Sequence, residues 1–411
     1  MAEHDNAFTC SNGIRLSGRQ WLGIGMFAVL LLVFASPLWK QVEPFDLKSD
    51  YRMPHDLSND YWLYARFTGL AAAQYDTVVL GDSVVWGEYV TPQGTLSHYL
   101  NELAGQERFA NLGLDGAHPL ALSGLVEHYA GSIRGKNVVL QCNPLWLSSP
   151  KTDLQDDKAT DFNHPRLVPQ FFPHIPSYKE EISPRLGVLV EQRLPFSQWT
   201  SHLQQAYYDR TDMPGWTLEH PYDNPLAPLT RGLPPSDNTL RHPAVPWFKG
   251  NVAKQDYPWV DLKSSLQWPA FQHVVELLQQ RGNRVFVLVG PFNEHLLTPA
   301  SLERYQGVKA EIAAWLKSRQ VAHAAPPPLP SELYGDASHP LAGGYVLLAR
   351  QLQADPVFQA TVASQPTGPR ASCYTGAEHR TSRKVASQGT SLLGAKTCAQ
   401  TEESSGPPRD G

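Results

Sequence analysis

Alternating apolar and polar runs along the chain predict a series of strands and helices. Short apolar runs with the length and β-branched content of buried strands occupy 77–80, 109–112, 137–141 and 284–289. Apolar residues at helical spacing occupy 95–103, 119–129, 262–280, 300–318 and 342–352. Strands that alternate with helices in this order form a parallel sheet with helices on both faces. The pattern therefore predicts an α/β fold with three layers.

One long stretch, 147–256, breaks this alternation. It is rich in Pro, His, Asp and aromatic residues, and only Leu186–Gln205 shows weak helical spacing. We interpret it as an irregular insertion that divides the sheet domain into a first part, 74–146, and a second part, 257–360. The final segment, 361–411, has too few apolar residues to form a core and is predicted to be a disordered tail.

An uncharged apolar segment from Trp21 to Trp39 is long enough to cross a bilayer, which takes about 20 residues. Trp residues at its two ends suit the two membrane interfaces. We therefore predict a cytoplasmic tail at 1–20, a single transmembrane anchor at 21–39 and a polar connector at 40–73. The alternatives are a cleaved signal peptide, whose apolar core is usually shorter, and a buried core helix.

The charges that flank this segment indicate its orientation. Arg15 and Arg19 precede it and favour a cytoplasmic N-terminus, whereas Lys40, Lys48 and Arg52 on the far side oppose that orientation. With the N-terminus inside, the sheet domain is extracytoplasmic, either periplasmic or extracellular. A cleaved signal peptide would place the domain in the same compartment.

Composition and charge exclude several classes of protein. The chain has 411 residues, of which 18% are charged, so it is long and apolar enough to form a substantial core. A net charge of −5 and the absence of long Lys/Arg runs argue against nucleic-acid binding. The four Cys residues show no C-x-x-C spacing, which excludes a zinc ribbon or a thioredoxin-like motif. Cys142 is expected to be buried; the others are Cys10, Cys373 and Cys398.

The chemistry that the sequence suggests begins at Gly81-Asp82-Ser83, directly after the first predicted strand. A tight turn at this point would expose the Ser83 hydroxyl at the edge of the sheet, which is a suitable position for a nucleophile. A serine hydroxyl needs a base to remove its proton, and an imidazole oriented by a carboxylate is the usual solution. Asp336 and His339, three residues apart before the last predicted helix, provide both groups.

Attack by Ser83 would create an oxyanion, which needs hydrogen-bond donors already in place. Gly113 and Asn143 follow the second and third predicted strands, so they are expected near the same edge of the sheet as Ser83. We therefore predict an oxyanion hole formed by Ser83, Gly113 and Asn143.

These segments together resemble the SGNH hydrolase family, also called the GDSL family, over about 75–146 and 257–352. The first family block matches as GDSVVWG with Ser83, the second as Asn111-Leu112-Gly113-Leu114-Asp115-Gly116, and the last as Asp336-x-x-His339-Pro340. The third block departs from the family pattern, because Gln141-Cys142-Asn143-Pro144 keeps only the Asn of Gly-x-Asn-Asp. The resemblance implies a flavodoxin-like parallel sheet of the SGNH type, with Ser83 as nucleophile, Asp336 and His339 as its acid and base, and Gly113 as a backbone oxyanion donor.

Several other polar and aromatic residues fall near the predicted sheet edge. We predict that they line a substrate site; they are Trp86, His118, Asn293, Glu294 and His295. Each also has a purely structural interpretation, because polar residues that close a strand often hydrogen-bond within loops and aromatic residues are often buried.

The predicted function is transfer of an acyl group, such as acetyl, from an ester to Ser83 and then to water or to a carbohydrate hydroxyl. A membrane anchor, an exported SGNH-like domain and a large insertion resemble envelope proteins that acylate or deacylate polysaccharides. This resemblance implies a membrane-bound acyl-transfer partner as one expected partner. The alternatives are a lipid or thioester hydrolase and a non-catalytic SGNH-like partner of a polysaccharide-modifying complex. No cofactor is expected, and no metal either, because His118, His295 and His339 lack ligand spacing.

Overall fold

The computed structural model describes residues 16–45, 47, 50–230, 232–233, 238 and 240–363. The chain divides into two compact units, residues 1–369 and 370–411, and every described residue belongs to the first. The predicted disordered tail beyond Ala363 lies outside the described residues, as do Cys10, Cys373 and Cys398.

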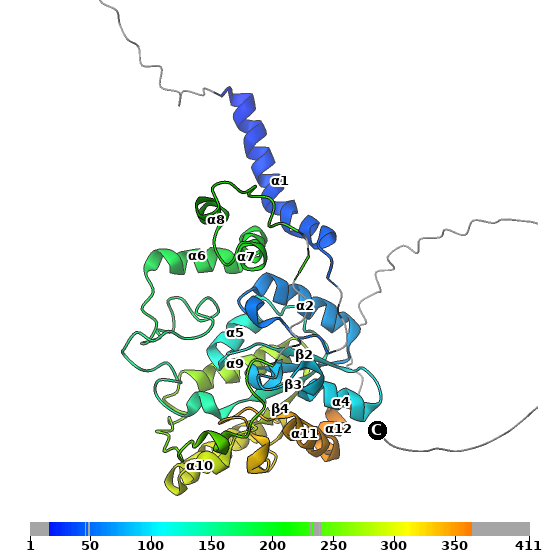
Figure 1. Cartoon of the computed structure of the whole chain (residues 1–411), viewed down its shortest axis with the longest axis vertical. Coiled ribbons are helices and arrows are strands. Elements are labelled where there is room, and N and C mark those ends of the chain that lie inside the picture. Colours follow the sequence, from blue (N-terminus) through cyan, green and yellow to red (C-terminus); the bar gives the residue numbers. More distant parts are fainter. Residues whose placement is uncertain are drawn as a thin grey trace, which may run out of the picture. The chain divides into compact units, whose positions relative to one another are not determined.

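A parallel sheet forms the centre of the fold (Figure 1). Its strands are β1 (Thr77–Gly81), β2 (Phe109–Gly113), β3 (Asn137–Cys142), β4 (Arg284–Val289) and β5 (Ala322–Ala324). They are hydrogen-bonded in the order β2-β1-β3-β4-β5, and every neighbouring pair is parallel. The carboxyl ends of all five strands therefore lie along one edge. The order changes direction between β1 and β3, where sheets of this kind commonly bind ligands.

Twelve α-helices accompany the sheet in the described part of the chain. They are α1 (Gly18–Val42), α2 (Tyr61–Gln74), α3 (Ser83–Trp86), α4 (Leu96–Ala104), α5 (Pro119–His128), α6 (Ile182–Arg193), α7 (Pro195–Tyr207), α8 (Met213–Glu219), α9 (Gln267–Gln280), α10 (Pro299–Ser318), α11 (Ala342–Ala354) and α12 (Pro356–Ala363). Short 3₁₀ helices occupy His55–Leu57, Pro92–Gly94, Pro144–Leu147, Trp247–Gly250, Glu294–Leu296 and Ser331–Leu333.

Helices cover both faces of the sheet, because successive residues of a strand point to opposite faces. In β1, Val78 and Leu80 pack into the core formed with α2, α5, α9 and α10, whereas Val79 packs into the core formed with α3, α4, α11 and α12. β4 alternates in the same way, with Val287 on the first face and Phe286 on the second. The predicted three-layer α/β arrangement is therefore present.

The predicted strands and helices of the sheet domain are confirmed, with small differences at their ends. Cys142 is buried, as expected. Two features differ from the prediction. β5 is only three half-buried residues long, too short to show a strand pattern. α12 ends at Ala363, beyond the predicted boundary at 360, because Phe358 and Val362 pack into the core on the second face.

The described residues of the segment 40–73, which was predicted to be a polar connector, are instead part of the folded domain. α1 continues to Val42, and α2 lies against the sheet with most of its residues buried, Tyr64 and Phe67 completely. α2 is apolar around much of its circumference, so it lacks the polar stripe by which an amphipathic helix is recognised. The side chain of Asp60 caps it by accepting a hydrogen bond from the N–H of Leu63 (2.9 Å).

The segment 147–256 is less irregular than predicted. It contains α6, α7 and α8, and the weak helical spacing of Leu186–Gln205 corresponds to α6 and α7. The two helices are separated at Leu194, because Pro195 begins α7 at the position where its missing N–H is not needed. Earlier in the segment, Val168 and Ile175 form a small core with Leu120 of α5.

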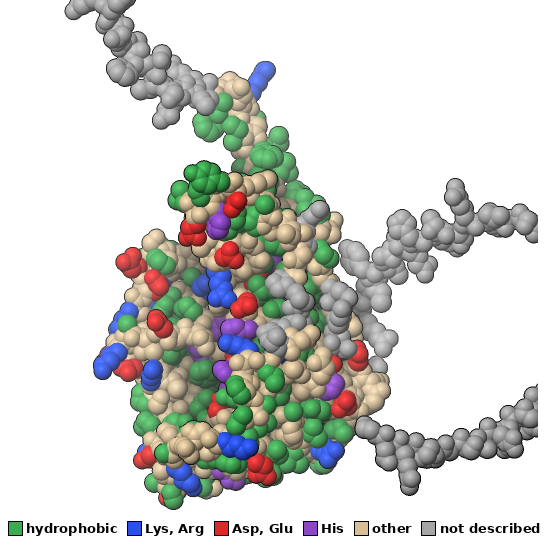
Figure 2. Space-filling view, in the orientation of Figure 1, with side chains coloured by type: hydrophobic (Ala, Val, Ile, Leu, Met, Phe, Trp, Pro, Cys, Tyr) green, Lys and Arg blue, Asp and Glu red, His purple; other side chains and the backbone are tan. Residues whose placement is uncertain are grey.

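α1 is long and apolar enough to cross a membrane. Nearly all of its large apolar side chains are exposed, which would be unfavourable in water over such a length. Figure 2 shows these apolar side chains along the helix. Only its C-terminal end packs against the rest of the fold: Ser36 is buried, and its hydroxyl accepts a hydrogen bond from the indole N–H of Trp62 (2.9 Å).

Candidate active site

The candidate nucleophile lies at the carboxyl end of the central strand β1. Gly81 ends this strand, and Asp82 caps the short helix α3 by accepting a hydrogen bond from the N–H of Val84 (2.9 Å). Ser83 is therefore the first residue of α3. A Cβ at position 81 would collide with the side chains of Val85 and Gln141, so only glycine allows this close turn between strand and helix.

The structure brings Ser83, His339 and Asp336 together, although 256 residues separate the first two. Ser83 Oγ lies 2.8 Å from His339 Nε2. On the other side of the ring, His339 Nδ1 lies 2.7 Å and 2.8 Å from the two carboxylate oxygens of Asp336. In the tautomer with the proton on Nδ1, the imidazole donates to Asp336 and accepts from the Ser83 hydroxyl. This is the hydrogen-bond geometry that activates a serine hydroxyl.

The loop that carries Asp336 and His339 is held by several hydrogen bonds. Asp336 Oδ1 accepts from the backbone N–H groups of Ser338 and His339, both at 2.9 Å. From the end of β4, Asn293 donates its side-chain amide to the carbonyl oxygen of Asp336 (2.9 Å) and its backbone N–H to that of Ala337 (2.8 Å). Asn293 is fully buried, so it positions this loop and does not line an open surface.

The pKa values of His339 and Asp336 reflect the contact between the two side chains. Burial lowers the pKa of His339, but the Asp336 carboxylate, with smaller effects from Asp82 and Glu88, outweighs burial, so the pKa lies above its ordinary value. Burial raises the pKa of Asp336, but His339 and the two backbone N–H groups outweigh it, so the pKa lies below its ordinary value. Asp336 is thus ionised at neutral pH and able to stabilise a protonated His339.

A second buried carboxylate, that of Asp82, supports the turn that carries Ser83. Its Oδ2 accepts hydrogen bonds from the side-chain amide of Asn143 and from the indole N–H of Trp146, both at 2.8 Å. Burial raises the pKa of Asp82, and these hydrogen bonds oppose the increase. The carboxyl ends of β1 and β3 are therefore joined through this side chain.

The predicted oxyanion donors are placed differently from expectation. The N–H of Gly113 donates to the side-chain oxygen of Asn111 (2.9 Å), so it is already occupied. Gly113 has a steric role instead, because a Cβ there would collide with the backbone of Trp86 in α3. The amide of Asn143 donates to Asp82 and, more weakly, to Ser338 Oγ (3.4 Å). Asn143 thus lies at the site but is also engaged.

Two backbone N–H groups in the same region have no acceptor among the described residues. One belongs to Ser83, at the start of α3, and the other to Gly116, in the loop that follows β2. Gly116 has a φ of +70°, a left-handed conformation that glycine adopts without strain. Gly116 belongs to the second family-like block of the sequence, which runs from Asn111 to Gly116. Gly113, and not Gly116, was the residue of that block predicted to donate to the oxyanion.

Two further residues predicted to line a substrate site are buried, as Asn293 is. Trp86 is completely buried, donates its indole N–H to the carbonyl of Met53 (2.7 Å) and stacks against Arg52. His118 is also buried; it caps α5, and its ring contacts Gln267. Burial lowers the pKa of His118 to about 4, so this side chain is neutral. Neither side chain is exposed in this structure, which differs from the expectation that they line a site.

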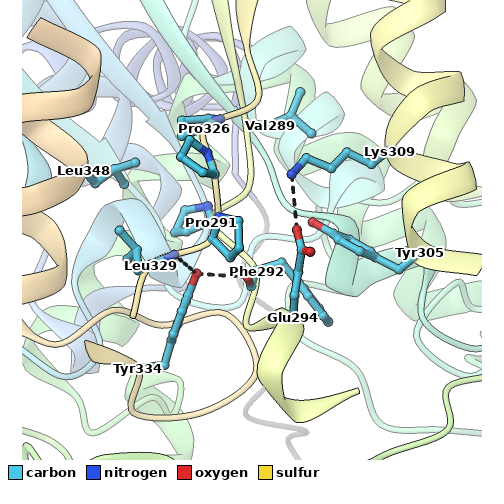
Figure 3. A pocket seen from close by; sticks show the side chains of 12 residues that line it. Val289, Pro291, Phe292, Glu294, Tyr305, Lys309, Pro326, Leu329, Tyr334 and Leu348 are labelled. Atoms are coloured by element: carbon cyan, nitrogen blue, oxygen red, sulfur yellow. Dashed lines mark hydrogen bonds and ion pairs between the residues drawn. The ribbon is translucent and has the colours of Figure 1, made fainter. Parts of the chain in front are cut away.

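Glu294 and His295 have partners other than Ser83, Asp336 and His339. Figure 3 shows Glu294 in a separate pocket, where its carboxylate pairs with Lys309 (3.3 Å) beside Tyr305. The ring of His295 is hydrogen-bonded to the carbonyl of Leu329 (3.0 Å). None of Ser83, Asp336 and His339 lines that pocket. The predicted substrate contacts of Glu294 and His295 therefore do not fit this arrangement.

Other side chains next to the site were not predicted. Glu88 follows α3, its N–H donates to the carbonyl of Ser83 (3.2 Å), and its carboxylate lies 2.8 Å from Nε2 of His242. The ring of Tyr89 lies 5.8 Å from that of His339 and 5.2 Å from that of His242. Glu88 and Tyr89 stand beside the Ser83 motif in the sequence and could have been found there.

The insertion contacts the site through Arg241, His242 and Trp247. Arg241 lies 3.2 Å from Asp115, which follows β2, and 3.5 Å from Glu88, while the neighbouring His242 contacts Glu88 directly. Farther along, the N–H of Trp247 donates to the carbonyl of Tyr334 (2.9 Å), just before the loop of the candidate acid and base. No periodic pattern marks this part of the sequence, so its position could not be predicted.

The described residues include no group of three His, Cys, Asp or Glu side chains placed to share a metal ion. His118, His295 and His339 have the separate partners given above. Comparison with known proteins adds no assignment, because no family model and no curated protein matches the chain. What the arrangement offers chemically is a serine hydroxyl beside a base, with unused N–H donors at the ends of the same strands.

Proposed function

We propose that this protein is a serine-dependent acyl-ester hydrolase or O-acyltransferase of the SGNH type. The observation that carries the proposal is the continuous chain of hydrogen bonds from Ser83 Oγ through His339 to Asp336, with 2.8 Å between Ser83 Oγ and His339 Nε2. Structural serine and histidine residues also form hydrogen bonds. Here, however, the serine begins a helix at the ligand-binding edge of the sheet, which favours the catalytic interpretation.

The reaction has two halves. Ser83 Oγ attacks the carbonyl carbon of an ester while its proton moves to His339 Nε2, and Asp336 stabilises the resulting imidazolium. The tetrahedral intermediate collapses when His339 returns the proton to the leaving alcohol, which leaves an acyl group on Ser83. Water or a carbohydrate hydroxyl then gives its proton to His339 and attacks the acyl carbonyl, and Ser83 recovers its proton as the product departs.

The oxyanion of each intermediate needs preorganised donors. We assign this role to the backbone N–H groups of Ser83 and Gly116, which have no acceptor among the described residues. The side chain of Asn143 is the third donor, because its weaker bond to Ser338 Oγ, at 3.4 Å, is the one it can most readily give up. The first hydrogen bond of this amide, to Asp82, holds it in place.

The SGNH assignment itself is supported by topology and by the positions of the sequence blocks. The strand order β2-β1-β3-β4-β5 is that of flavodoxin-like doubly wound sheets. The blocks that contain Ser83, Gly116 and Asn143 each follow the carboxyl end of a strand, and the block with Asp336 and His339 precedes α11. These positions support the SGNH proposal.

The proposal also includes a cellular location and a class of substrate. α1 would anchor the chain as a single-pass membrane protein with its sheet domain extracytoplasmic, where the substrate would be a cell-envelope or extracellular carbohydrate. Arg241, His242 and Tyr89 gather beside His339, so the insertion contributes to the site. An acceptor held there would compete with water for the acyl group, and a membrane-bound partner would be one source of that group.

The test is ester hydrolysis by the detergent-solubilised full chain. We expect 4-nitrophenyl acetate to be hydrolysed by the wild type and by Ser264→Ala, which changes an exposed serine far from the site in sequence, but not by Ser83→Ala. A preference for octanoate over acetate would favour a lipid or thioester hydrolase. Activity that survives Ser83→Ala, or none in the wild type with esters of any length, would contradict the proposal and favour a non-catalytic partner.

A further inference from the structure

The end of α1 is fixed to the folded domain by a buried cluster of charged groups. Glu43 caps the helix, and its carboxylate contacts the ring of His202 in α7 (2.8 Å) and the guanidinium of Arg66 in α2 (2.7 Å). His202 also contacts Asp60 at the start of α2 (2.6 Å), and Tyr207 donates to Glu43 (2.6 Å). Because these side chains are buried, α1 continues into the domain as a docked element and not as a flexible tether.

The length of α1 determines how near this cluster lies to a membrane. From Trp21 to Trp39, at 1.5 Å per residue, the helix spans about 28 Å, close to the thickness of the hydrocarbon layer. Trp39 therefore lies at the interface when the segment crosses a bilayer. The ring of Trp39 packs against Trp199 (6.0 Å) and Tyr207 (6.1 Å) of α7. Helix α7 is consequently held at the level of the lipid headgroups.

Helix α8 packs against the same aromatic side chains of α7. Its Trp216 packs against Tyr208, at the end of α7, in a small core to which Trp39 also contributes. Figure 1 shows α8 on the side of α7 toward which α1 extends. The opposite face of α8 and the residues after it carry large side chains that are mostly exposed: Leu218 is 82% exposed, Tyr222 99% and Leu226 61%. We call these three residues the α8 patch.

We propose that the α8 patch inserts into the headgroup layer of the bilayer that α1 crosses, so that the domain is held against the membrane in one orientation. The occupant is lipid because α8, which carries the patch, packs through Trp216 into the same small core as Trp39 of α1, the residue at the membrane interface. Apolar and Tyr side chains suit this layer. Figure 2 shows apolar side chains, with acidic ones next to them, in the region of α8. Glu219 and Asp223 flank the patch, so anionic lipid is not required.

The inference rests on the anchoring part of the proposed function, and the experiment separates the two. Single cysteines at Leu218 and Tyr222 carry an environment-sensitive fluorophore in the full chain, with Cys10, Cys373 and Cys398 changed to Ser. Leu30→Cys, in the middle of α1, reports the anchor. Leu103→Cys on α4, which is 42% exposed and apolar, is the matched control. The protein is reconstituted into phosphatidylcholine nanodiscs with or without doxyl-labelled lipid.

We expect doxyl lipid to quench positions 30, 218 and 222 and to leave position 103 unchanged. If position 30 is quenched but positions 218 and 222 are quenched no more than position 103, the lipid-facing α8 patch is overturned and the membrane anchor stands. Protection of 218 and 222 from aqueous iodide without doxyl quenching would also overturn it, in favour of a second copy of the chain. No quenching at position 30 would overturn the anchor, and the α8 patch proposal with it.

Discussion

Replacement of His202 should be among the most damaging single changes in this protein. Its ring lies between the carboxylates of Asp60 and Glu43, stacks on Trp62 at 4.3 Å and is fully buried, as are both carboxylates. His202→Ala leaves two buried negative charges without the cation between them. Removal of one member of a buried ion pair typically costs about 3–5 kcal/mol. Arg66 still contacts Glu43, so we expect a loss near the lower end of that range.

The pKa of His202 gives the same magnitude independently. Burial lowers the pKa, but the Asp60 and Glu43 carboxylates more than offset this and raise it to about 9. Relative to an ordinary value near 6.5, this corresponds to about 3 kcal/mol of stability. Because the folded-state pKa is raised, the contribution is complete below about pH 6.5 and is lost as the pH rises through about 9. Between about pH 7 and pH 10 the wild type should lose about 2.5 kcal/mol from this group alone.

The assay is urea unfolding of the detergent-solubilised full chain, followed by tryptophan fluorescence at several pH values. His202→Gln should lower the midpoint at pH 7 and flatten its decline between pH 7 and 10. His273→Ala, which changes an exposed histidine of α9, should match the wild type at every pH. The reasoning would be refuted if His202→Gln cost less than about 1 kcal/mol at pH 7, or if it declined with pH as steeply as the wild type.

Three further outcomes follow from the site. Asp336→Asn should lower kcat by as much as about 10⁴-fold, and it should move the pH midpoint of the residual rate downward because the pKa of His339 is no longer raised; an unchanged midpoint in pH–rate profiles would contradict this. Asn293→Ala should lower kcat and leave KM nearly unchanged, because the loop of Asp336 loses a hydrogen bond that holds it. The loss should correspond to about 1–3 kcal/mol in activation free energy, and a change confined to KM in steady-state kinetics would contradict this. Trp86→Phe should lower the melting temperature and leave KM unchanged, since Trp86 is a core residue; an increase in KM without loss of stability would restore its predicted role in substrate binding.

The sheet and the Ser–His–Asp arrangement could be predicted because their signals are local. A strand such as Thr77–Gly81 is a continuous apolar run, and Ser83 follows it immediately. Asp336 and His339 lie three residues apart before an amphipathic helix, so their mutual contact also follows from sequence spacing. The parallel order of the strands then requires Ser83 and Asn143 to lie at a common edge.

The remaining features depend on contacts between distant residues. Trp86 and His118 were predicted to line a site, but whether an aromatic residue is exposed depends on neighbours such as Met53 and Gln267, which a local pattern does not reveal. The N–H of Gly113 donates to the side chain of Asn111. This hydrogen bond depends on the rotamer of Asn111, which the spacing of residues in the sequence does not reveal. α2 was missed because a helix that is buried around most of its circumference has no polar stripe.

The central claim is that Ser83 is a nucleophile that accepts an acyl group. The most direct test is intact-mass analysis of the full chain after treatment with a fluorophosphonate, which forms a stable adduct only with an activated serine. We predict one adduct on the wild type and on Ser264→Ala, located at Ser83 by peptide mapping, and none on Ser83→Ala or His339→Ala. An unmodified wild type, or an adduct that persists in Ser83→Ala, would contradict the account.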